Sequence, residues 1–476
     1  MIHLDRTGSI GLTDQIVQQF AALIQAGQLP AGSRLPSIRK LAATLTVSSA
    51  TVVAAYDRLA ARGLTISRAA SGYFVQARPA PEAPSLVPPR RETIDAVWQL
   101  RRMLDTKPSM LPAGSGYLPE AWLEDMLSTR LLVRLARSGQ RAFASPAGAQ
   151  GYAPLRRQLS LKLGQAGIPA HPDQIVMTFG ATQAVDIIIR LLLVAGDTVA
   201  IEEPNYYGLT AQLRANGIRL IPIPRRTDGP DLDSLETACT HYRPKLFFTQ
   251  TLMHNPTGTS TSIAVASRLL QLAERHDLLV VEDDVYGDLF PTSNPVHLAQ
   301  IDRLQRVIYV SSFSKVVSPN IRVGFMAAPE AFVEAFIEAK MLSVLATSEF
   351  DERLIYEVLA EGRYRKHLER VRLRLARQWP SVVTGLRQAG LQVETGEHAA
   401  FFVWASLPPG LDEESLVRDA AENNILLTPG SVFFLGETPR PWLRFSAASA
   451  NVPRLFAYMK ARIAALTAIS KSVLVR

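Results

Sequence analysis

The chain has 476 residues, a net charge of +8 and one cysteine, Cys239; its length exceeds what one hydrophobic core usually organises, so we expect several domains. A single cysteine excludes an intrachain disulfide and favours a reducing compartment. Arg190 breaks the apolar run 186–197 and no signal-peptide core precedes it, so we expect a cytoplasmic protein with no membrane partner.

The first eighty residues have the pattern of a small helical domain. Residues 13–27 show helical spacing of apolar side chains, and Ser37 is placed to cap a short helix. A tight turn leads to a second helix, capped by Ser48 and ended by Gly63. Residues 64–75 then predict a two-stranded wing. Two helices joined in this way form a helix-turn-helix, whose second helix enters the major groove of DNA.

The charge of this segment fits a nucleic-acid partner. Residues 1–78 hold eight Lys or Arg against three Asp, a net of +5, so most of the chain's net charge of +8 lies here. A basic face is often merely solvated, but here it accompanies a helix-turn-helix and a wing. Together they indicate binding to the phosphate backbone of double-stranded DNA.

The runs LPSIRKLA, VSSATVVAAYDRL and SGYFV resemble the winged helix-turn-helix of GntR-family regulators. The resemblance implies base contacts from the recognition helix and backbone contacts from the wing. The DNA-contacting positions that it implies are Arg34, Arg39, Ser48, Ser49, Thr51 and Arg68. Ser49 departs from the family, which commonly has arginine there; a long donor to guanine is lost, so we expect different bases to be read.

A proline-rich segment separates this domain from the rest. Five prolines lie between residues 79 and 89, and such a stretch tends to the extended polyproline II conformation of a semi-rigid spacer. We therefore expect three parts: a DNA-binding domain at 1–78, a linker at 79–107 and a large domain at 108–476.

The large domain begins with alternating strands and helices. A short strand passes through Gly180 into a helix, which places Ala181 and Thr182 at a helix N-terminus, a natural seat for a phosphate. The next strand ends before Tyr206, whose ring could stack on a flat ligand or simply pack in the core.

Two further strands end in polar residues. One runs into the turn Asn255-Pro256-Thr257-Gly258, and another carries Asp283 and Tyr286 at its carboxyl end. Open α/β sheets bind ligands outside these ends. Asp283 could keep a pyridine nitrogen protonated, or it could be an ordinary loop carboxylate or helix cap. Asn255 and Tyr286 could hydrogen-bond a phenolic oxygen.

Lys315 lies just past an apolar strand in the run SSFSKVVSPNIRVGF. A lysine there is commonly a solvated charge. With Ser312, Ser314 and Arg322 around it, however, it is the arrangement that an aldehyde carrying a phosphate requires: the amine condenses with the aldehyde, and the hydroxyls and guanidinium bind the phosphate.

Arg444 lies within the apolar strand of PWLRFSAA. A buried guanidinium is costly unless it is paired. Its partner could be the carboxylate of a small molecule or an internal carboxylate.

This ordered set resembles the fold-type I aminotransferases, α/β proteins with a large and a small subdomain that bind pyridoxal 5′-phosphate. The resemblance implies that Lys315 forms the internal aldimine, Asp283 pairs with the pyridine nitrogen, and Arg444 binds an α-carboxylate. It assigns Tyr206 to ring stacking, Asn255 and Tyr286 to the phenolic oxygen, and Ser312, Ser314 and Arg322 to the phosphate. Phe143 stands where the family usually has a tyrosine that reaches the neighbouring subunit's phosphate.

A winged helix joined to an aminotransferase-like domain is similar to the MocR/GabR subgroup of GntR regulators, which implies a homodimer. We expect a DNA-binding transcriptional regulator rather than an enzyme, in which an amino-compound effector displaces Lys315 by aldimine exchange. The alternative is an amino acid aminotransferase with an accessory DNA-binding domain. A binding protein without the cofactor is disfavoured because Lys315, Asp283 and Arg322 occur together.

Overall fold

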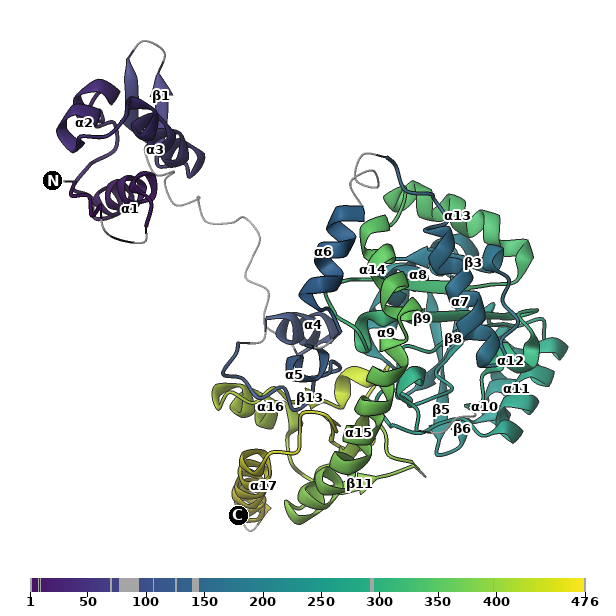
Figure 1. Ribbon diagram of the computed structural model, residues 1–476. Coiled ribbons are helices and arrows are strands. Elements are labelled where there is room, and N and C mark those ends of the chain that lie inside the picture. Colours follow the sequence, from purple (N-terminus) through teal and green to yellow (C-terminus); the bar gives the residue numbers. More distant parts are fainter. Residues whose placement is uncertain are drawn as a thin grey trace. The chain divides into compact units, whose positions relative to one another are not determined.

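The computed structural model describes all residues except 1, 7, 9, 69–70, 77–93, 106, 125, 139–144, 292–294, 397 and 475–476, and gives only the backbone of 138 and 467–474. The chain divides into two compact units, Met1–Arg91 and Glu92–Arg476. Each unit has its own hydrophobic core, so each is described by itself (Figure 1).

The first unit has three helices and a hairpin: α1 (Leu12–Gln25), α2 (Ile38–Leu45), α3 (Ser49–Ala61), β1 (Thr65–Arg68) and β2 (Gly72–Val75). Ser37 and Ser48 cap α2 and α3 through their side chains, which confirms both predicted caps. The axes of α2 and α3 differ by 118°, as in a helix-turn-helix. Val52, Tyr56 and Leu59 of α3 pack against α1, and β1 pairs with β2 as the predicted wing.

The second unit is built on an eight-stranded sheet with the order β3-β10-β9-β8-β7-β4-β5-β6. Strands β4, β5, β7, β8 and β9 are parallel, and β10 runs antiparallel between β3 and β9. The strand bounds are β3 (Ile175–Thr178), β4 (Thr198–Glu203), β5 (Arg219–Arg226), β6 (Gly229–Pro230), β7 (Leu246–Thr249), β8 (Leu279–Asp283), β9 (Val307–Ser312) and β10 (Gly324–Ala327). The ends of β3, β4, β7, β8 and β9 therefore meet along one edge, where the predicted site residues lie.

Helices cover both faces of this sheet (Figure 1). Neighbouring residues of one strand, such as Val280 and Val281 of β8, belong to the cores on opposite faces. One face carries α8 (Gly180–Leu192), α9 (Tyr207–Ala215) and α13 (Glu330–Val344). The other carries α7 (Ala153–Gln165), α10 (Leu232–Tyr242), α11 (Ile263–Arg275), α12 (Leu298–Asp302) and α14 (Glu349–Ala360). This is the doubly wound α/β arrangement of the predicted fold class.

A smaller four-stranded sheet, β11-β12-β14-β13, forms the expected second subdomain. Its strands are β11 (Gln392–Glu394), β12 (Phe402–Ser406), β13 (Thr428–Pro429) and β14 (Trp442–Ser446), and its helices are α15 (Arg363–Gln388), α16 (Glu413–Glu422) and α17 (Pro453–Leu474). Four short 3₁₀ turns among the described residues are η1 (Pro172–Gln174), η2 (Gly287–Leu289), η3 (Phe313–Lys315) and η4 (Ser431–Phe433). Phe401 and Phe402, at the start of β12, bring aromatic rings from the small subdomain to Tyr286 of the large one.

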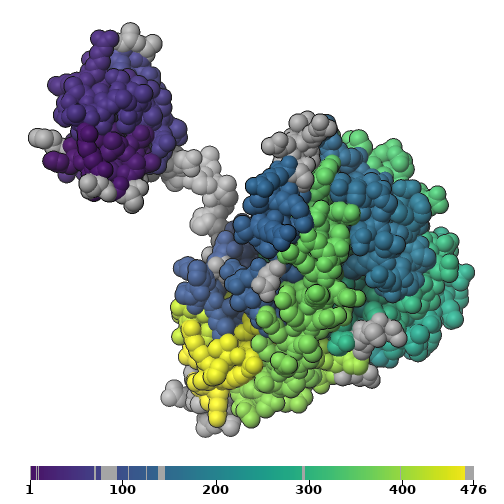
Figure 2. Space-filling model, in the orientation of Figure 1, coloured from purple at the N-terminus to yellow at the C-terminus, as the bar shows by residue number. Residues whose placement is uncertain are grey.

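Before α7, the second unit begins with the helices α4 (Ala96–Leu104), α5 (Glu120–Leu123) and α6 (Thr129–Ser138). Figure 2 shows this blue stretch on the surface beside the green α15. The expected linker 79–107 thus contains a helix, α4, which packs within the second unit because Trp98, Leu100 and Met103 bury apolar surface. The prolines at 79–89 lie outside the described residues.

In the part of the chain that the structure describes, no single helix is long and apolar enough to cross a membrane. Only the bent pair α2 and α3 passes that test jointly, by length and composition.

Candidate functional site

The turn after β9 and the start of α8 form one corner of the site. Arg322 donates from Nη1 to Ser314 Oγ at 3.0 Å and from Nη2 to the carbonyl of Phe179 at 3.3 Å. A Cβ on Gly180 would lie 2.8 Å from Arg322 Nη2, so only glycine lets the two approach. Helix α8 has no side-chain cap, which leaves the first-turn N–H groups near Ala181 and Thr182 available to an anion.

Ser312 is turned inward at this corner. Its Oγ accepts from the Ser314 N–H at 3.1 Å and lies 3.0 Å from Ser314 Oγ and 3.2 Å from the carbonyl of Val323. It therefore caps the turn η3 and orients Ser314. Of the two predicted serines, Ser314 is the one that shares its hydroxyl with Arg322.

Lys315 extends from η3 between two tyrosines. Its Nζ lies 3.9 Å from the ring centre of Tyr117 and 5.7 Å from that of Tyr286. Burial, together with the positive charges of Arg444 and Arg322, lowers the pKa of Lys315 to about 7 against the opposing effect of Asp283. A large fraction of this amine is therefore unprotonated, and hence nucleophilic, at neutral pH.

Asp283 ends β8 and is held by a residue that the sequence did not single out. Gln250 donates from Nε2 to Asp283 Oδ2 at 2.8 Å, and its Oε1 accepts from the N–H of Asn255 at 2.7 Å. Asp283 Oδ1 is buried with no hydrogen-bond partner in the described part of the chain. Burial raises the pKa of Asp283, and a cationic N–H donor at Oδ1 would offset that cost.

The residues from different strand ends converge beside Gly116. A Cβ at Gly116 would lie 2.9 Å from Tyr286 Oη, 3.7 Å from Lys315 Nζ and 3.9 Å from Arg444 Nη2. Tyr286 lies three residues beyond β8 rather than on the strand as predicted, and its hydroxyl donates to the Gly116 carbonyl at 3.0 Å. Segments far apart in the sequence therefore meet within a few ångströms.

Tyr206 lies at the start of α9, with its ring centre 5.0 Å from that of Tyr207. Burial raises the pKa of Tyr206, as do the neighbouring tyrosines and Asp283. The negative charge of Asp283 thus acts on Tyr206, whose ring can cover a flat ligand.

Arg444 of β14 is 1% exposed, and no ion pair to it occurs among the described residues. Nη1 donates to Asn255 Oδ1 and Nη2 to the carbonyl of Gly114, both at 2.7 Å. Its Nε is buried without a hydrogen-bond partner in the same part of the chain. A buried guanidinium with one idle donor is suited to a carboxylate ligand.

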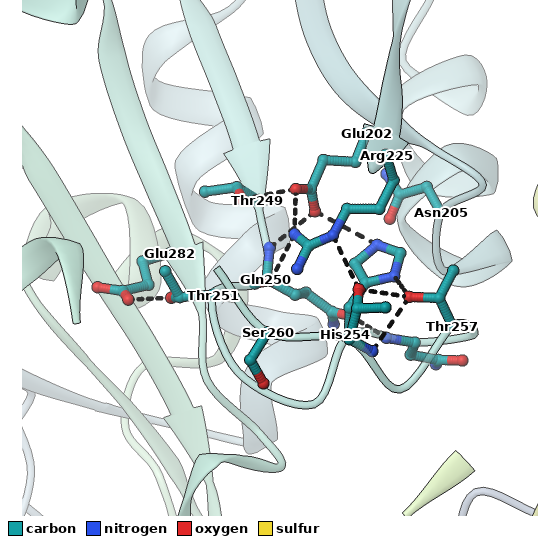
Figure 3. Close-up of polar contacts among 12 residues, drawn as sticks. Glu202, Asn205, Arg225, Thr249, Gln250, Thr251, His254, Thr257, Ser260 and Glu282 are labelled. Carbon is teal, nitrogen blue, oxygen red and sulfur yellow. Dashed lines mark hydrogen bonds and ion pairs between the residues drawn. The ribbon is translucent and has the colours of Figure 1, made fainter. Parts of the chain in front are cut away.

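The loop that carries Asn255 rests on a buried ionic network (Figure 3). Glu202 pairs with Arg225 at 2.5 Å, and His254 Nε2 lies 3.3 Å from Glu202 Oε2. Burial opposes ionisation of Glu202, but the charge of Arg225 prevails and lowers its pKa to about 2. Burial and Arg225 lower the pKa of His254, so its ring is neutral and its Nδ1 is free to meet Thr257 Oγ1 at 2.9 Å. The network fixes the turn at Asn255.

The predicted DNA-contacting residues lie together in the first unit. Arg39 at the start of α2 and Ser48 and Ser49 at the start of α3 are exposed, and Thr51 is half-buried with its Oγ1 2.8 Å from Ser48 Oγ. On the wing, the guanidinium carbons of Arg34 and Arg68 lie 6.0 and 4.8 Å from the ring centre of Phe74. The predicted recognition-helix residues thus lie at the starts of α2 and α3, and the two wing arginines stack on one ring.

Sequence reasoning missed Gln250, Tyr117 and Gly116. The only available signal for Gln250 was its position directly after an apolar strand, and Tyr117 follows the run AGSG, which carries no polar group typical of a site other than one serine. Phe143, the predicted departure at the neighbouring-subunit contact, lies outside the described residues.

These residues fit pyridoxal phosphate. The buried Asp283 Oδ1, which lacks a hydrogen-bond partner in the described residues, suits the pyridine nitrogen. The nucleophilic amine of Lys315 suits the aldehyde, and Arg322 with Ser314 suits the phosphate.

Comparison with known proteins agrees with both units. The family model "Aminotransferase class I and II" matches residues 112–455, and "Bacterial regulatory proteins, gntR family" matches residues 12–75. The uncharacterized HTH-type transcriptional regulator YdcR of Escherichia coli is 30% identical over 91% of this chain and 94% of its own length. The probable rhizopine catabolism regulatory protein MocR of Rhizobium meliloti is 30% identical over 92% and 90%.

Enzymes are also similar over the large domain. The 2-aminoadipate transaminase of Thermus thermophilus is 34% identical over 63% of this chain and 76% of its own. The crystal structure of LysN, the α-aminoadipate aminotransferase of that organism, in complex with N-(5′-phosphopyridoxyl)-L-leucine, has a TM-score of 0.70 at 29% identity, covering 78% of this chain and 95% of LysN. The fold of the second unit is therefore that of these aminotransferases.

Proposed function

Because this chain belongs to the MocR-type GntR regulators, with a pyridoxal-phosphate-binding aminotransferase class I and II domain, we propose that it senses an amino compound at Lys315. Binding of this compound changes the affinity of the protein for operator DNA. The observation that carries this proposal is the meeting of Lys315 Nζ, Tyr286 Oη and Arg444 Nη2 around Gly116 in a chain that also has a winged helix.

The cofactor, when bound, supplies an aldehyde that primary amines attack. Asp283 would hold the pyridine nitrogen through Oδ1, and Ser314, Arg322 and the start of α8 would hold the phosphate. Asn255 and Tyr286 would contact the phenolic oxygen, and Tyr206 would cover the ring.

An effector needs two groups to occupy this site. Its amine competes with Lys315 Nζ, and its carboxylate binds Arg444 through Nε and the remaining Nη donors. The effector shifts the protein between states only by its difference in affinity for them. The Nζ that it displaces is again a free amine between Tyr117 and Tyr286.

The lowered pKa of Lys315 gives a pH dependence. Below about pH 7 the amine is protonated, and above it the amine is neutral, so the rate at which cofactor-free protein captures pyridoxal phosphate should rise with pH and level off above about 7. An ordinary lysine would keep accelerating toward about 10.4. Stopped-flow absorbance at several pH values measures this, with pyridoxal as the control for titration of the phosphate. A rate still rising tenfold per pH unit above pH 9 contradicts the assignment.

Replacing Arg39 by alanine should weaken operator binding by about 5- to 150-fold, as expected when about 1–3 kcal/mol of contact to a base is lost. Fluorescence anisotropy with operator DNA measures the change. Arg62→Ala is the matched control. Arg62 carries the same charge as Arg39 and is exposed, but it lies at the C-terminal end of α3, away from the helix start that is predicted to contact DNA. Equal losses in both variants would mean that Arg39 contributes only its charge.

The homodimer and the cytoplasmic location are parts of the same proposal. The end of α13 exposes a run of apolar side chains, with Leu342 92% and Leu345 73% exposed next to Met341 and Val344. Such a patch is typical of an interface. A duplex-DNA partner requires the compartment that holds the chromosome.

The direct test is to titrate holoprotein with each of the twenty common L-amino acids, following visible absorbance and operator affinity in parallel. We expect at least one amino acid to change both at the same concentration. An amino acid that changes the absorbance but not the operator affinity would refute sensing of that compound. If none of the twenty amino acids changed the operator affinity, amino acid sensing would be refuted.

The second candidate is an aminotransferase that also binds DNA, favoured by the complete set of polar groups around Lys315. After exchange, Lys315 could act as a general base. Multiple turnovers at about 1 s⁻¹ or faster with an amino acid and a keto acid, with no protected promoter, would favour the enzyme over the regulator.

A further inference from the structure

Helix α4 carries a buried amide that is not needed for its packing. Gln99 is 1% exposed, and its Nε2 donates to Thr428 Oγ1 of β13 at 2.9 Å. Its Oε1 is buried without a hydrogen-bond partner in the described ranges. A leucine would fill the same volume without the cost of desolvating an amide, so the hydrogen bond itself calls for an explanation.

The partner of Gln99 leads directly to the site. Thr428 donates from Oγ1 to the carbonyl of Gly114 at 2.8 Å, and that oxygen also accepts from Arg444 Nη2 at 2.7 Å. A Cβ on Gly114 would lie 2.5 Å from Thr428 Oγ1, so glycine is required for this approach. Three buried hydrogen bonds, which we call the Gln99 relay, therefore join α4 to the guanidinium of Arg444.

A carboxylate at Arg444 would bind the same guanidinium that ends this relay. The guanidinium is planar and rigid. Any rotation that turns Nε toward a ligand therefore also turns the Nη2 proton that faces Gly114. The same helix touches the site from a second side, since Ala96 and Leu100 pack against the aromatic cluster of Tyr207 and Phe433. Phe433 lies 5.1 Å from the guanidinium carbon of Arg444.

Helix α4 is also the first described element after residues 77–93, which connect it to the DNA-binding unit. We propose that Gln99 is a positioning residue that reports the occupancy of Arg444 to α4, and thereby couples effector binding to operator affinity. This rests on the proposed function, because it assumes that an effector carboxylate binds Arg444. A coupling claim of this kind requires a measured coupling energy.

The first experiment needs no effector. Amide hydrogen exchange in α4 is measured by mass spectrometry for full-length holoprotein and for Thr428→Val, which removes the central hydroxyl, with Thr428→Ser as the variant that keeps it. We expect about fivefold faster exchange in Thr428→Val, from the loss of a buried hydrogen bond, and near wild-type exchange in Thr428→Ser. Arg444→Lys should also speed exchange in α4. Unchanged exchange in both Thr428→Val and Arg444→Lys overturns the relay.

The second experiment measures coupling. The probe is whichever common L-amino acid most changes wild-type operator affinity, and the coupling factor is the ratio of operator affinities with and without it. In Gln99→Leu this coupling factor should fall to within about twofold of one. The visible absorbance should still change when the amino acid is added, and the melting temperature should stay close to wild type. Val97→Ala, on the exposed side of α4, should keep the wild-type factor.

The two proposals fail in different ways. A wild-type coupling factor that persists in Gln99→Leu overturns the relay alone. If no amino acid alters wild-type operator affinity, sensing and coupling both fail, whereas the exchange experiment still decides whether α4 and Arg444 are linked. A double variant Gln99→Leu/Thr428→Val that loses no more coupling than either single variant supports one shared path.

Discussion

Lys315→Ala is expected to abolish both the visible absorbance of the holoprotein and any response of operator affinity to amino acids. No other amine lies between Tyr117 and Tyr286 in the described part of the chain, so no replacement nucleophile is available. Operator affinity without effector should stay near wild type, because the winged helix has its own core. Absorbance spectroscopy and fluorescence anisotropy measure the two effects.

The controls for Lys315→Ala distinguish loss of the reactive amine from loss of a positive charge. Lys315→Arg keeps a cation but cannot condense with an aldehyde, so it should lose the absorbance as well, whereas the exposed Lys366→Ala should keep it. Borohydride reduction followed by peptide mass mapping gives an independent check. A pyridoxyl adduct on a peptide that lacks Lys315 would overturn the assignment.

Arg444→Gln is expected to weaken binding of an α-amino acid by about 100-fold or more, because a buried carboxylate would lose its charged partner. Ethylamine is the matched ligand, since it is L-alanine without the carboxylate. Its binding should change little. Absorbance titration of the holoprotein with both ligands measures this difference.

Two further variants test the Arg444 prediction. Arg444→Lys restores a point charge without paired donors and should recover only part of the affinity. Arg440→Gln removes a nearby surface arginine that pairs with Glu394 at 2.9 Å, and should leave binding unchanged. Equal losses for L-alanine and ethylamine in Arg444→Gln would show that Arg444 supports the fold of the site and does not bind the carboxylate.

Much of the fold could be predicted because its signals are local. Ser37 and Ser48 precede helices and cap them, and the apolar runs before Asp283 and Ser312 are buried strands. Because carboxyl ends of parallel strands share an edge, residues separated by more than a hundred positions could be expected to meet there.

What could not be predicted depends on tertiary contacts. Gln250 is meaningful only through its bonds to Asp283 and Asn255. Arg322 adopts a left-handed conformation, with φ of +51°, that no local residue pattern required. Helix α4 was assigned to the linker because the prolines before it dominated the composition, whereas its burial depends on the aromatic cluster of the second unit.

The buried network of Glu202, Arg225 and His254, which supports the turn at Asn255, limits how the site responds to pH. The pKa of Glu202 is about 2, so this carboxylate stays ionised well below neutral pH. The pKa of His254 is lowered, so its ring resists protonation. A moderate fall in pH therefore leaves both groups in the same charge state. Lys315, in contrast, loses its proton close to neutrality. A shift in pH near neutrality would therefore change the charge of the Lys315 amine and leave the charges of Glu202 and His254 unaltered.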